Sequence, residues 1–293
     1  MKLASYIYKD RPTYGAVIGD RLFDLKSRLG DKADSLVQFI EQDLLGEAQT
    51  LIDGAGGDFA IGEVTFLPPV PKPVLCIGVN YKSRPDELSS TGYGWNYPSL
   101  FWRTSSAHAA HQQPILNPPE SDRLDYEGEI AIVIGKGGRR IAKEEGIGHI
   151  FGYTCFNDGS VRDWMRHTTA NVTSGKNFYQ SGSIGPWITT ADEIVNPHDM
   201  TLEVRVNGQT RQKDTTANMM RPYEELLAYV STMMPVEPGD VIATGTPIGV
   251  GGALKPPVWL KAGDVVEIEV SGVGVLRNTV VDEKAELYQG GGP

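Results

Sequence analysis

The chain is poor in cysteine, in histidine and in positive charge, and each scarcity excludes a class of protein. Its 293 residues include two cysteines and five histidines, and 27 basic residues face 37 acidic ones, for a net charge of −10. No two histidines are spaced as His-x₃-His, which argues against a zinc enzyme. No basic cluster is present, so we expect neither nucleic acid nor an anionic membrane as a partner.

Two further absences bear on the compartment. Cys76 and Cys155 both lie in apolar, strand-like stretches, which favours buried thiols in a reducing compartment over a disulfide. No apolar run has the length of a membrane span, and residues 1–10 lack the apolar block and the cleavage site of a signal peptide. We therefore expect a cytoplasmic protein.

The chain is rich in residues that end strands and helices. Its 34 glycines and 19 prolines separate short apolar stretches, which predicts an α+β fold that is mainly β. Residues 1–67 are predicted to form a small N-terminal α/β domain, with short strands around Gly19-Asp20 and a helix over residues 34–51. A proline-rich linker at residues 67–73 leads to a second, larger domain over 74–285, and the glycine-rich residues 286–293 are predicted to be a disordered tail.

Two glutamates precede the most apolar strand of the sequence. Glu127 and Glu129 come just before the run 130–134, and side chains two residues apart leave a strand on the same side. Converging carboxylates repel each other unless they share a proton or bind a cation. Asp158 ends another apolar run 29 residues after Glu129. Three carboxylates without cysteine or histidine suit a hard cation, Mg²⁺ or Ca²⁺.

Further polar segments complete an ordered pattern. They are Gly78-Val79-Asn80-Tyr81, Asp125-Tyr126-Glu127-Gly128-Glu129, residues 152–163, Gly175-Lys176, Gly185-Pro186, Val206-Asn207-Gly208 with Gln212, and residues 239–251 around Gly245-Thr246-Pro247. In this order they resemble the fumarylacetoacetate hydrolase family over roughly residues 70–285, and the N-terminal module is similar to the small domain of many members.

The resemblance implies a fold, a metal and a chemistry. It implies a mixed β-sandwich roll, a homodimer, and Mg²⁺ (or Mn²⁺ or Ca²⁺) held by Glu127, Glu129 and Asp158. The substrates of the family are small keto acids, especially 2,4-dioxo and related β-keto acids. Its reactions include C–C hydrolysis, decarboxylation and keto–enol or double-bond isomerisation. Lys176 is implied as a second positive charge in catalysis, and the implied substrate-binding residues are Tyr81, Arg84, Arg103, Gln212 and Thr246.

The chain departs from the family in the segment that follows Tyr81. Hydrolytic members usually place a histidine three residues before a glutamate there, and the pair activates water. Here Glu87 occupies the glutamate position as a catalytic candidate, but Arg84 stands in place of the histidine. Arginine cannot act as a base, although it can clamp a carboxylate. His108 or His111 could take over the role, against the interpretation that both are exposed on a polar loop.

The sequence therefore leaves several functions open. Its first prediction is a metal-dependent hydrolase that cleaves a C–C bond in a small acylpyruvate-like keto acid, as the resemblance implies. The alternative is an isomerase, tautomerase or decarboxylase of a 2-oxo dicarboxylic acid, because these reactions need no attacking water. A third interpretation is a metal-binding scaffold without catalysis. Intact Glu127, Glu129, Asp158 and Lys176 argue against it.

Overall fold

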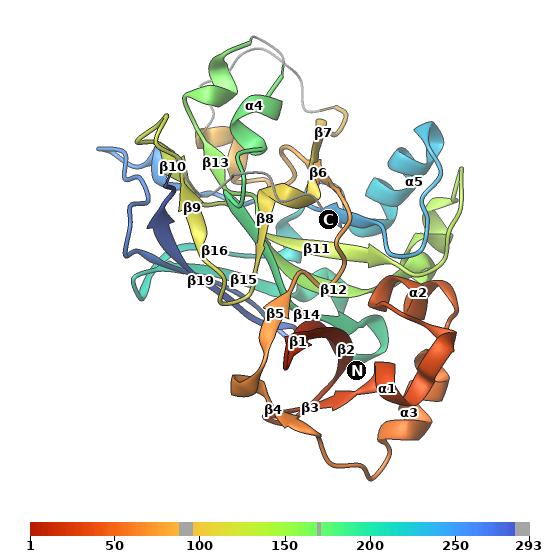
Figure 1. The fold of residues 1–293 in the computed structure, drawn as a ribbon. Helices are drawn as coiled ribbons and strands as arrows, with labels where there is room; N and C mark the ends of the chain where they lie inside the picture. The colour runs from red at the N-terminus through yellow and green to blue at the C-terminus, as the bar shows by residue number, and fades with distance from the viewer. Residues whose placement is uncertain (88–95, 169–170, 285–293) are drawn as a thin grey trace.

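The computed structural model describes residues 1–87, 96–168 and 171–284. The N-terminal part forms a meander of short strands with helices on one side (Figure 1). Its elements are β1 (Lys2–Tyr8), β2 (Arg11–Ile18), β3 (Arg21–Asp24), α1 (Leu25–Leu29), α2 (Leu36–Glu41), α3 (Leu45–Ile52), β4 (Phe59–Ala60) and β5 (Thr65–Leu67).

The helix predicted over residues 34–51 is divided in two. Ser35 caps α2, because its side chain accepts a hydrogen bond from the backbone N–H of Gln38. The chain then turns at Asp43, whose φ of 51° lies in the left-handed region, and α3 begins at Leu45. The apolar period continues across this turn, so the sequence pattern alone does not reveal the break.

The remaining strands belong to three sheets. The large sheet contains β6 (Val74–Ile77), β7 (Leu100–Arg103), β8 (His108–Ala110), β11 (Gly128–Ile134), β12 (Ile150–Asn157), β14 (Gly182–Thr190) and β17 (Val241–Ala243). A five-stranded sheet contains β9 (Ile115–Asn117), β15 (Thr201–Val206), β16 (Gln209–Thr215), β18 (Val265–Val270) and β19 (Gly274–Asp282). A short pair joins β10 (Leu124–Asp125) to β13 (Ser160–Val161), and the helices of this region are α4 (Thr173–Lys176) and α5 (Tyr223–Met233).

The N-terminal strands continue the large sheet. Its order is β4-β3-β2-β1-β14-β12-β11-β17-β6-β7, with β5 on β1 and β8 on β14. The joint is the antiparallel pairing of β1 with β14, in which Lys2 lies opposite Thr189 and Leu3 opposite Ile188. Strands from both sides of the linker at residues 67–73 thus share one sheet. A domain boundary at this linker stays a prediction.

The central strand β11 is buried on both faces. Ile130, Ile132 and Ile134 pack in the core between the large and the five-stranded sheet, together with side chains of β15, β18 and α5. Ala131 and Val133 point to the other face, where the N-terminal helices cover the sheet. Strands buried on both faces read as continuous apolar runs, which is the pattern of residues 130–134.

The architecture confirms the expected class, a mainly β α+β fold in which helices are short and peripheral (Figure 1). Across residues 1–87, 96–168 and 171–284, no helix combines the length and the apolar character that a bilayer crossing requires.

Candidate metal centre

Neighbouring strands bring the three predicted carboxylates together. Glu127 directly precedes β11, Glu129 is its second residue, and Asp158 directly follows β12, which pairs antiparallel with β11. The backbone N–H of Asp158 donates to the carbonyl of Glu127 at 2.8 Å. One carboxylate oxygen from each of the three residues lies within 4.8 Å of the others, and all three side chains are buried.

Glycine between the two glutamates allows the sheets to approach closely. A Cβ atom on Gly128 would lie 2.1 Å from Cγ2 of Val204 on β15, which is far inside van der Waals contact. The N–H of Gly128 donates to Oε1 of Gln212 at 2.9 Å. The Glu-Gly-Glu sequence therefore places two acids on one side while their spacer packs against the facing sheet.

Lys176 lies against two of the three carboxylates. Its Nζ donates to Glu127 Oε2 at 2.6 Å and to Asp158 Oδ2 at 2.5 Å, and the residue is 2 % exposed. The short helix α4 carries this lysine, and Phe101 packs beneath its ammonium group at 5.2 Å. The structure thus places Lys176 at the candidate centre, where the resemblance implied it.

Two arginines share the other oxygen of Glu127. Arg162 Nη2 lies 2.7 Å and Arg84 Nη2 lies 3.3 Å from Glu127 Oε1. Burial by itself would raise the pKa of Glu127, but Arg162, Lys176 and Arg84 outweigh it and hold the pKa of this carboxyl well below its usual range. Glu127 is therefore ionised at any ordinary pH.

Glu129 has the opposite environment. The one hydrogen bond that the structure records for its carboxylate comes from the backbone N–H of Gly245, at 2.8 Å to Oε2. Burial, followed by the charges of Asp158 and Glu127, raises the pKa of Glu129 well above its usual value. Metal binding at this centre would release that proton, since a ligating carboxylate must be ionised.

Asp158 is held by Arg103 as well as by Lys176. Arg103 is fully buried, and its Nη1 donates to Asp158 Oδ1 and to the carbonyl of Gly159, both at 2.6 Å. Its Nη2 donates to Ser181 Oγ at 3.0 Å. The guanidinium thus braces the loop after β12, and a direct contact of Arg103 with substrate stays a prediction.

Arg162 and Asp125 form an ion pair that the sequence did not reveal. Arg162 Nε donates to Asp125 Oδ2 at 2.8 Å, and Asp125 also accepts from the backbone N–H groups of Gly251 and Gly252. Asp125 thus links β10 to the loop after residue 250 and orients Arg162 towards Glu127. Asp125 stands in the quoted Asp-Tyr-Glu-Gly-Glu segment, so its position was the available signal.

Gln212 and Thr246 connect the loop around Gly245-Thr246-Pro247 to the backbone at Gly128. Gln212 Nε2 donates to Thr246 Oγ1 at 2.9 Å, and Thr246 Oγ1 donates to the carbonyl of Gly128 at 2.8 Å. Both side chains are buried, so Gln212 is not a surface residue. These bonds fix the backbone between Glu127 and Glu129, and substrate contact by either side chain stays a prediction.

The remaining candidates lie around this centre. Tyr81 is fully buried, its hydroxyl finds no hydrogen-bond partner among residues 1–87, 96–168 and 171–284, and burial raises its pKa. Glu87 ends the turn Arg84–Glu87, but its side chain lies outside the described part of the chain. His108 is buried against Phe156, contrary to the expectation of an exposed loop, and His111 packs against Phe66. Among the described contacts, neither histidine bonds to the three carboxylates.

The donor set fits a hard divalent cation. Each of the three acids offers an oxygen, and in the described part of the chain no sulfur or imidazole joins them. The cations Lys176, Arg84, Arg103 and Arg162 surround the acids and balance their charge. Oxygen-only sets suit Mg²⁺, Mn²⁺ and Ca²⁺.

Comparison with known proteins identifies the family. Residues 73–281 match the model of the fumarylacetoacetate (FAA) hydrolase C-terminal domain. The chain belongs to the fumarylacetoacetate hydrolase family. Among its relatives, the mitochondrial oxaloacetate tautomerase Fahd2a of Rattus norvegicus is 36% identical over 268 residues, which cover 90% of this chain and 85% of that protein. The mitochondrial oxaloacetate tautomerase FAHD2A of Bos taurus is 40% identical over 222 residues, which cover 75% and 70%.

Solved structures of the family have the same fold. A maleylpyruvate hydrolase from Sphingobium sp. SYK-6, in complex with manganese(II) and pyruvate, superposes with a TM-score of 0.80 at 30% identity and covers 97% of this chain and 100% of that chain. A 2-hydroxyhepta-2,4-diene-1,7-dioate isomerase from Mycobacterium marinum gives a TM-score of 0.73 at 27% identity, covering 97% and 99%. The family thus contains both hydrolases and isomerases of this shape.

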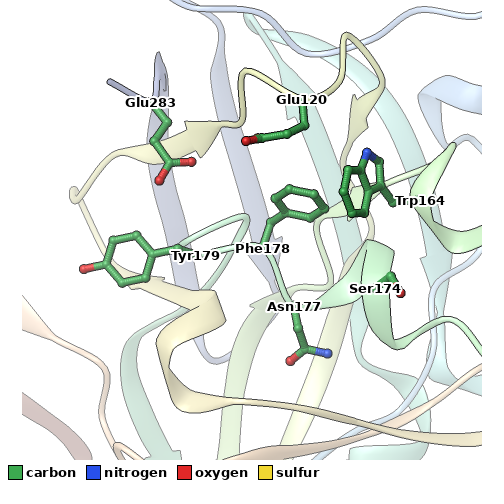
Figure 2. Close-up of a pocket in the computed structure, with 7 residues that line it drawn as sticks. All are labelled: Glu120, Trp164, Ser174, Asn177, Phe178, Tyr179 and Glu283. Atoms are coloured by element: carbon green, nitrogen blue, oxygen red, sulfur yellow. The ribbon is translucent and has the colours of Figure 1, made fainter. Parts of the chain in front are cut away.

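A hollow of about 380 Å³ lies beside α4, the short helix that carries Lys176. It is lined by Glu120, Trp164, Ser174, Asn177, Phe178, Tyr179 and Glu283 (Figure 2). The rings of Trp164 and Phe178 meet edge to face, with centroids 4.9 Å apart. None of the three candidate metal ligands lines this hollow, and the two packed rings support the chain on either side of α4.

Proposed function

We propose that this chain is a divalent-metal-dependent enzyme that interconverts the keto and enol forms of a small 2-oxo dicarboxylic acid, with oxaloacetate as the test substrate. The observation that carries the proposal is Arg84, which is 5 % exposed and lies beside the predicted metal ligand Glu127. The relatives named oxaloacetate tautomerase point the same way.

Arg84 favours a reaction that needs no activated water. A guanidinium stays protonated at any accessible pH and cannot remove a proton from water. Tautomerisation moves a proton between a carbon and an oxygen of one substrate, so it requires no attacking water. An arginine in this position also suits a substrate with a carboxylate, which it can hold through paired hydrogen bonds.

The charge of the centre supports a dianionic substrate. Four acids (Asp125, Glu127, Glu129 and Asp158) face four cations (Arg84, Arg103, Arg162 and Lys176). When all eight groups are ionised their charges cancel, and a divalent cation leaves two positive charges in excess. A dicarboxylate carries the matching two negative charges, and opposite charges attract strongly where water is excluded.

Each residue has a proposed part. Glu127, Glu129 and Asp158 would hold the metal, which would stabilise negative charge that develops on a substrate carbonyl oxygen. Lys176 would donate a hydrogen bond to the same region, and Arg84 would orient a substrate carboxylate. Glu87 remains the proposed group that moves the proton.

The test follows keto–enol exchange of oxaloacetate by NMR with Mg²⁺, with Mn²⁺, and with EDTA. We expect metal-dependent exchange above the rate of metal ion without protein, without release of CO₂, and its loss in Glu129→Gln. Exchange no faster than the protein-free control would contradict the proposal. Metal-dependent release of pyruvate and CO₂ would instead indicate a decarboxylase.

C–C hydrolysis is the second candidate, and the match to the maleylpyruvate hydrolase structure favours it. Acetylpyruvate and fumarylpyruvate test it, since hydrolysis yields pyruvate plus a second carboxylic acid. If the missing histidine limits hydrolysis, Arg84→His should raise the rate of acid release. Hydrolysis that stays at background in Arg84→His would show that the absent base is not the cause. A scaffold without catalysis would bind metal but gain no affinity for oxalate.

Other features carried by the resemblance remain proposals. They are the identity of the metal as Mg²⁺ and a homodimer. The cytoplasmic location expected from the sequence is likewise a proposal, whereas the relatives named above are described as mitochondrial.

A further inference from the structure

A cavity of about 420 Å³ lies beside the candidate centre and is strongly basic. Arg123, Arg162 and Arg166 line it, with Asp163 as the one acidic residue and Trp259 as an aromatic wall. The backbone N–H of Arg162 donates to the carbonyl of Arg123 at 3.1 Å, which joins the two segments that carry the arginines.

Two of the three guanidinium groups have little or no negative charge paired with them among the described residues. Arg166 is exposed, and the described part of the chain gives its side chain no hydrogen bond and no ion pair. Arg123 has one weak pair, 3.7 Å to the exposed Asp122. Asp163 is itself engaged, because its Oδ1 accepts a hydrogen bond from Ser121 at 2.7 Å. The cavity therefore offers cationic donors that have few partners among the described residues.

The third guanidinium connects the cavity to the candidate metal centre. Arg162 Nε bonds to Asp125, and its Nη2 lies against Glu127. Within the described ranges, the one hydrogen-bond partner of its Nη1 is the sulfur of Met165, at 4.0 Å. A guanidinium has five N–H donors, so Arg162 keeps donors for the cavity while it holds both acids.

We propose that this cavity binds a small oxyanion, with Arg166, Arg123 and Nη1 of Arg162 as donors. Three guanidinium groups around one space recognise carboxylate, sulfate or phosphate oxygens. The oxyanion has two possible sources: the distal carboxylate of the substrate, which rests on the proposed function, or a separate anion that binds beside the centre. The proposed binding of an oxyanion in this cavity does not depend on which of the two sources supplies it.

The first test measures sulfate binding to the metal-free protein by calorimetry at low ionic strength, against chloride at the same ionic strength. We expect sulfate to bind, Arg166→Ala to weaken its affinity at least fivefold, and Arg123→Ala to weaken it further in combination. Arg139→Ala is the matched control, since Arg139 is an exposed arginine outside the cavity. Equal affinity in the wild type, Arg166→Ala and Arg139→Ala, or no sulfate binding at all, would overturn the proposal.

The second test identifies the source of the oxyanion from oxaloacetate exchange kinetics. If the cavity holds the substrate's distal carboxylate, sulfate competes with substrate and Arg166→Ala raises KM with little change in kcat. If the occupant is a separate anion, sulfate leaves KM unchanged, and either result supports the site. The calorimetric test needs no turnover, so a failed site and a failed tautomerase assignment give different results.

Discussion

At the scale of single residues, the three acids differ in what surrounds them. Glu127 has three cationic neighbours, Asp158 has two, and for Glu129 the structure records a backbone N–H alone. The surroundings thus shift the pKa values of the two glutamates in opposite directions before a metal binds, down for Glu127 and up for Glu129. Breaking a buried ion pair leaves an uncompensated charge, whereas neutralising a repelled carboxylate does not.

We therefore predict opposite effects of the same substitution at two positions. Glu127→Gln should lower the free energy of unfolding of the metal-free protein by about 3–5 kcal/mol, because Arg84, Arg162 and Lys176 each lose one charged partner at a largely buried site. Glu129→Gln should leave it within about 1 kcal/mol of the wild type, because the raised pKa of Glu129 favours the neutral carboxyl, which an amide of similar shape replaces. Urea unfolding in EDTA measures both values.

The control for this prediction is Mn²⁺ binding, which both variants should lose in large part since each removes a ligand oxygen. Equal destabilisation by the two substitutions would show that Glu129 is ionised and paired in the metal-free protein.

Gln212 gives a second prediction at residue scale. Gln212→Leu should lower the free energy of unfolding by about 1–3 kcal/mol, because the N–H of Gly128 would remain buried without its acceptor. Gln209→Leu, an exposed change on the same strand, serves as the control and should alter stability little. If Gln212→Leu instead raises KM without lowering stability, the side chain contacts substrate, as the family resemblance implied.

At the scale of elements, local pattern and long-range pairing differ in how well the sequence predicts them. The two-residue period predicts that Glu127 and Glu129 converge, and the apolar run predicts the buried strand β11. Asp158 was indicated by its place at the end of another apolar run, and the family resemblance then indicated Lys176. These inferences need only nearby residues or a shared pattern.

The cationic surroundings could not be predicted in this way. Arg84, Arg103 and Arg162 lie far from their acidic partners along the chain, and only the sheet order brings them together. The burial of Gln212 and His108 likewise depends on the facing sheet and on β14. A single sequence records side-chain chemistry but not the partner that a non-local strand supplies.

The segment after β8 gives a prediction on pH. Burial, then the nearby charge of Arg277, lowers the pKa of His111 to about 4, and its Nδ1 accepts from the N–H of Arg277. The unfolded pKa is about 6.5, so folding favours neutral imidazole. This stabilisation is complete above about pH 6.5 and is lost as the pH falls towards 4, with a maximum of about 3 kcal/mol.

Unfolding free energies measured between pH 7 and 4 test this. His111→Gln keeps a hydrogen-bond acceptor but cannot titrate, so its stability should fall less steeply with acid than that of the wild type. His167→Gln, at an exposed position, should follow the wild type. Parallel pH profiles for His111→Gln and the wild type would assign the acid sensitivity to other groups.

At the scale of the whole molecule, the large sheet extends beyond the segment that matches the family model. The match begins at residue 73, whereas the large sheet includes β1 to β5. Apolar side chains of β11 and β17 pack in one cluster with those of α2, including Phe39 and Ile40.

A chain shortened to residues 68–293 should therefore aggregate or elute as large species in size-exclusion chromatography. Its β14 would present an unpaired edge, and the face of the sheet that α2 covers would be exposed. Adding a separate chain of residues 1–67 should restore part of the dispersed protein. A shortened chain that stays dispersed and binds Mn²⁺ would show that the boundary predicted at the linker separates independent domains.

The pairing of β1 with β14 also limits how this chain can be recombined. A hybrid that takes its first 67 residues from another family member must match the register at Thr189 and Ile188 as well as the helix-covered face of the sheet. A substitution in β14 therefore limits which N-terminal segments can still pair with it, and the two parts of the chain are expected to vary in sequence together.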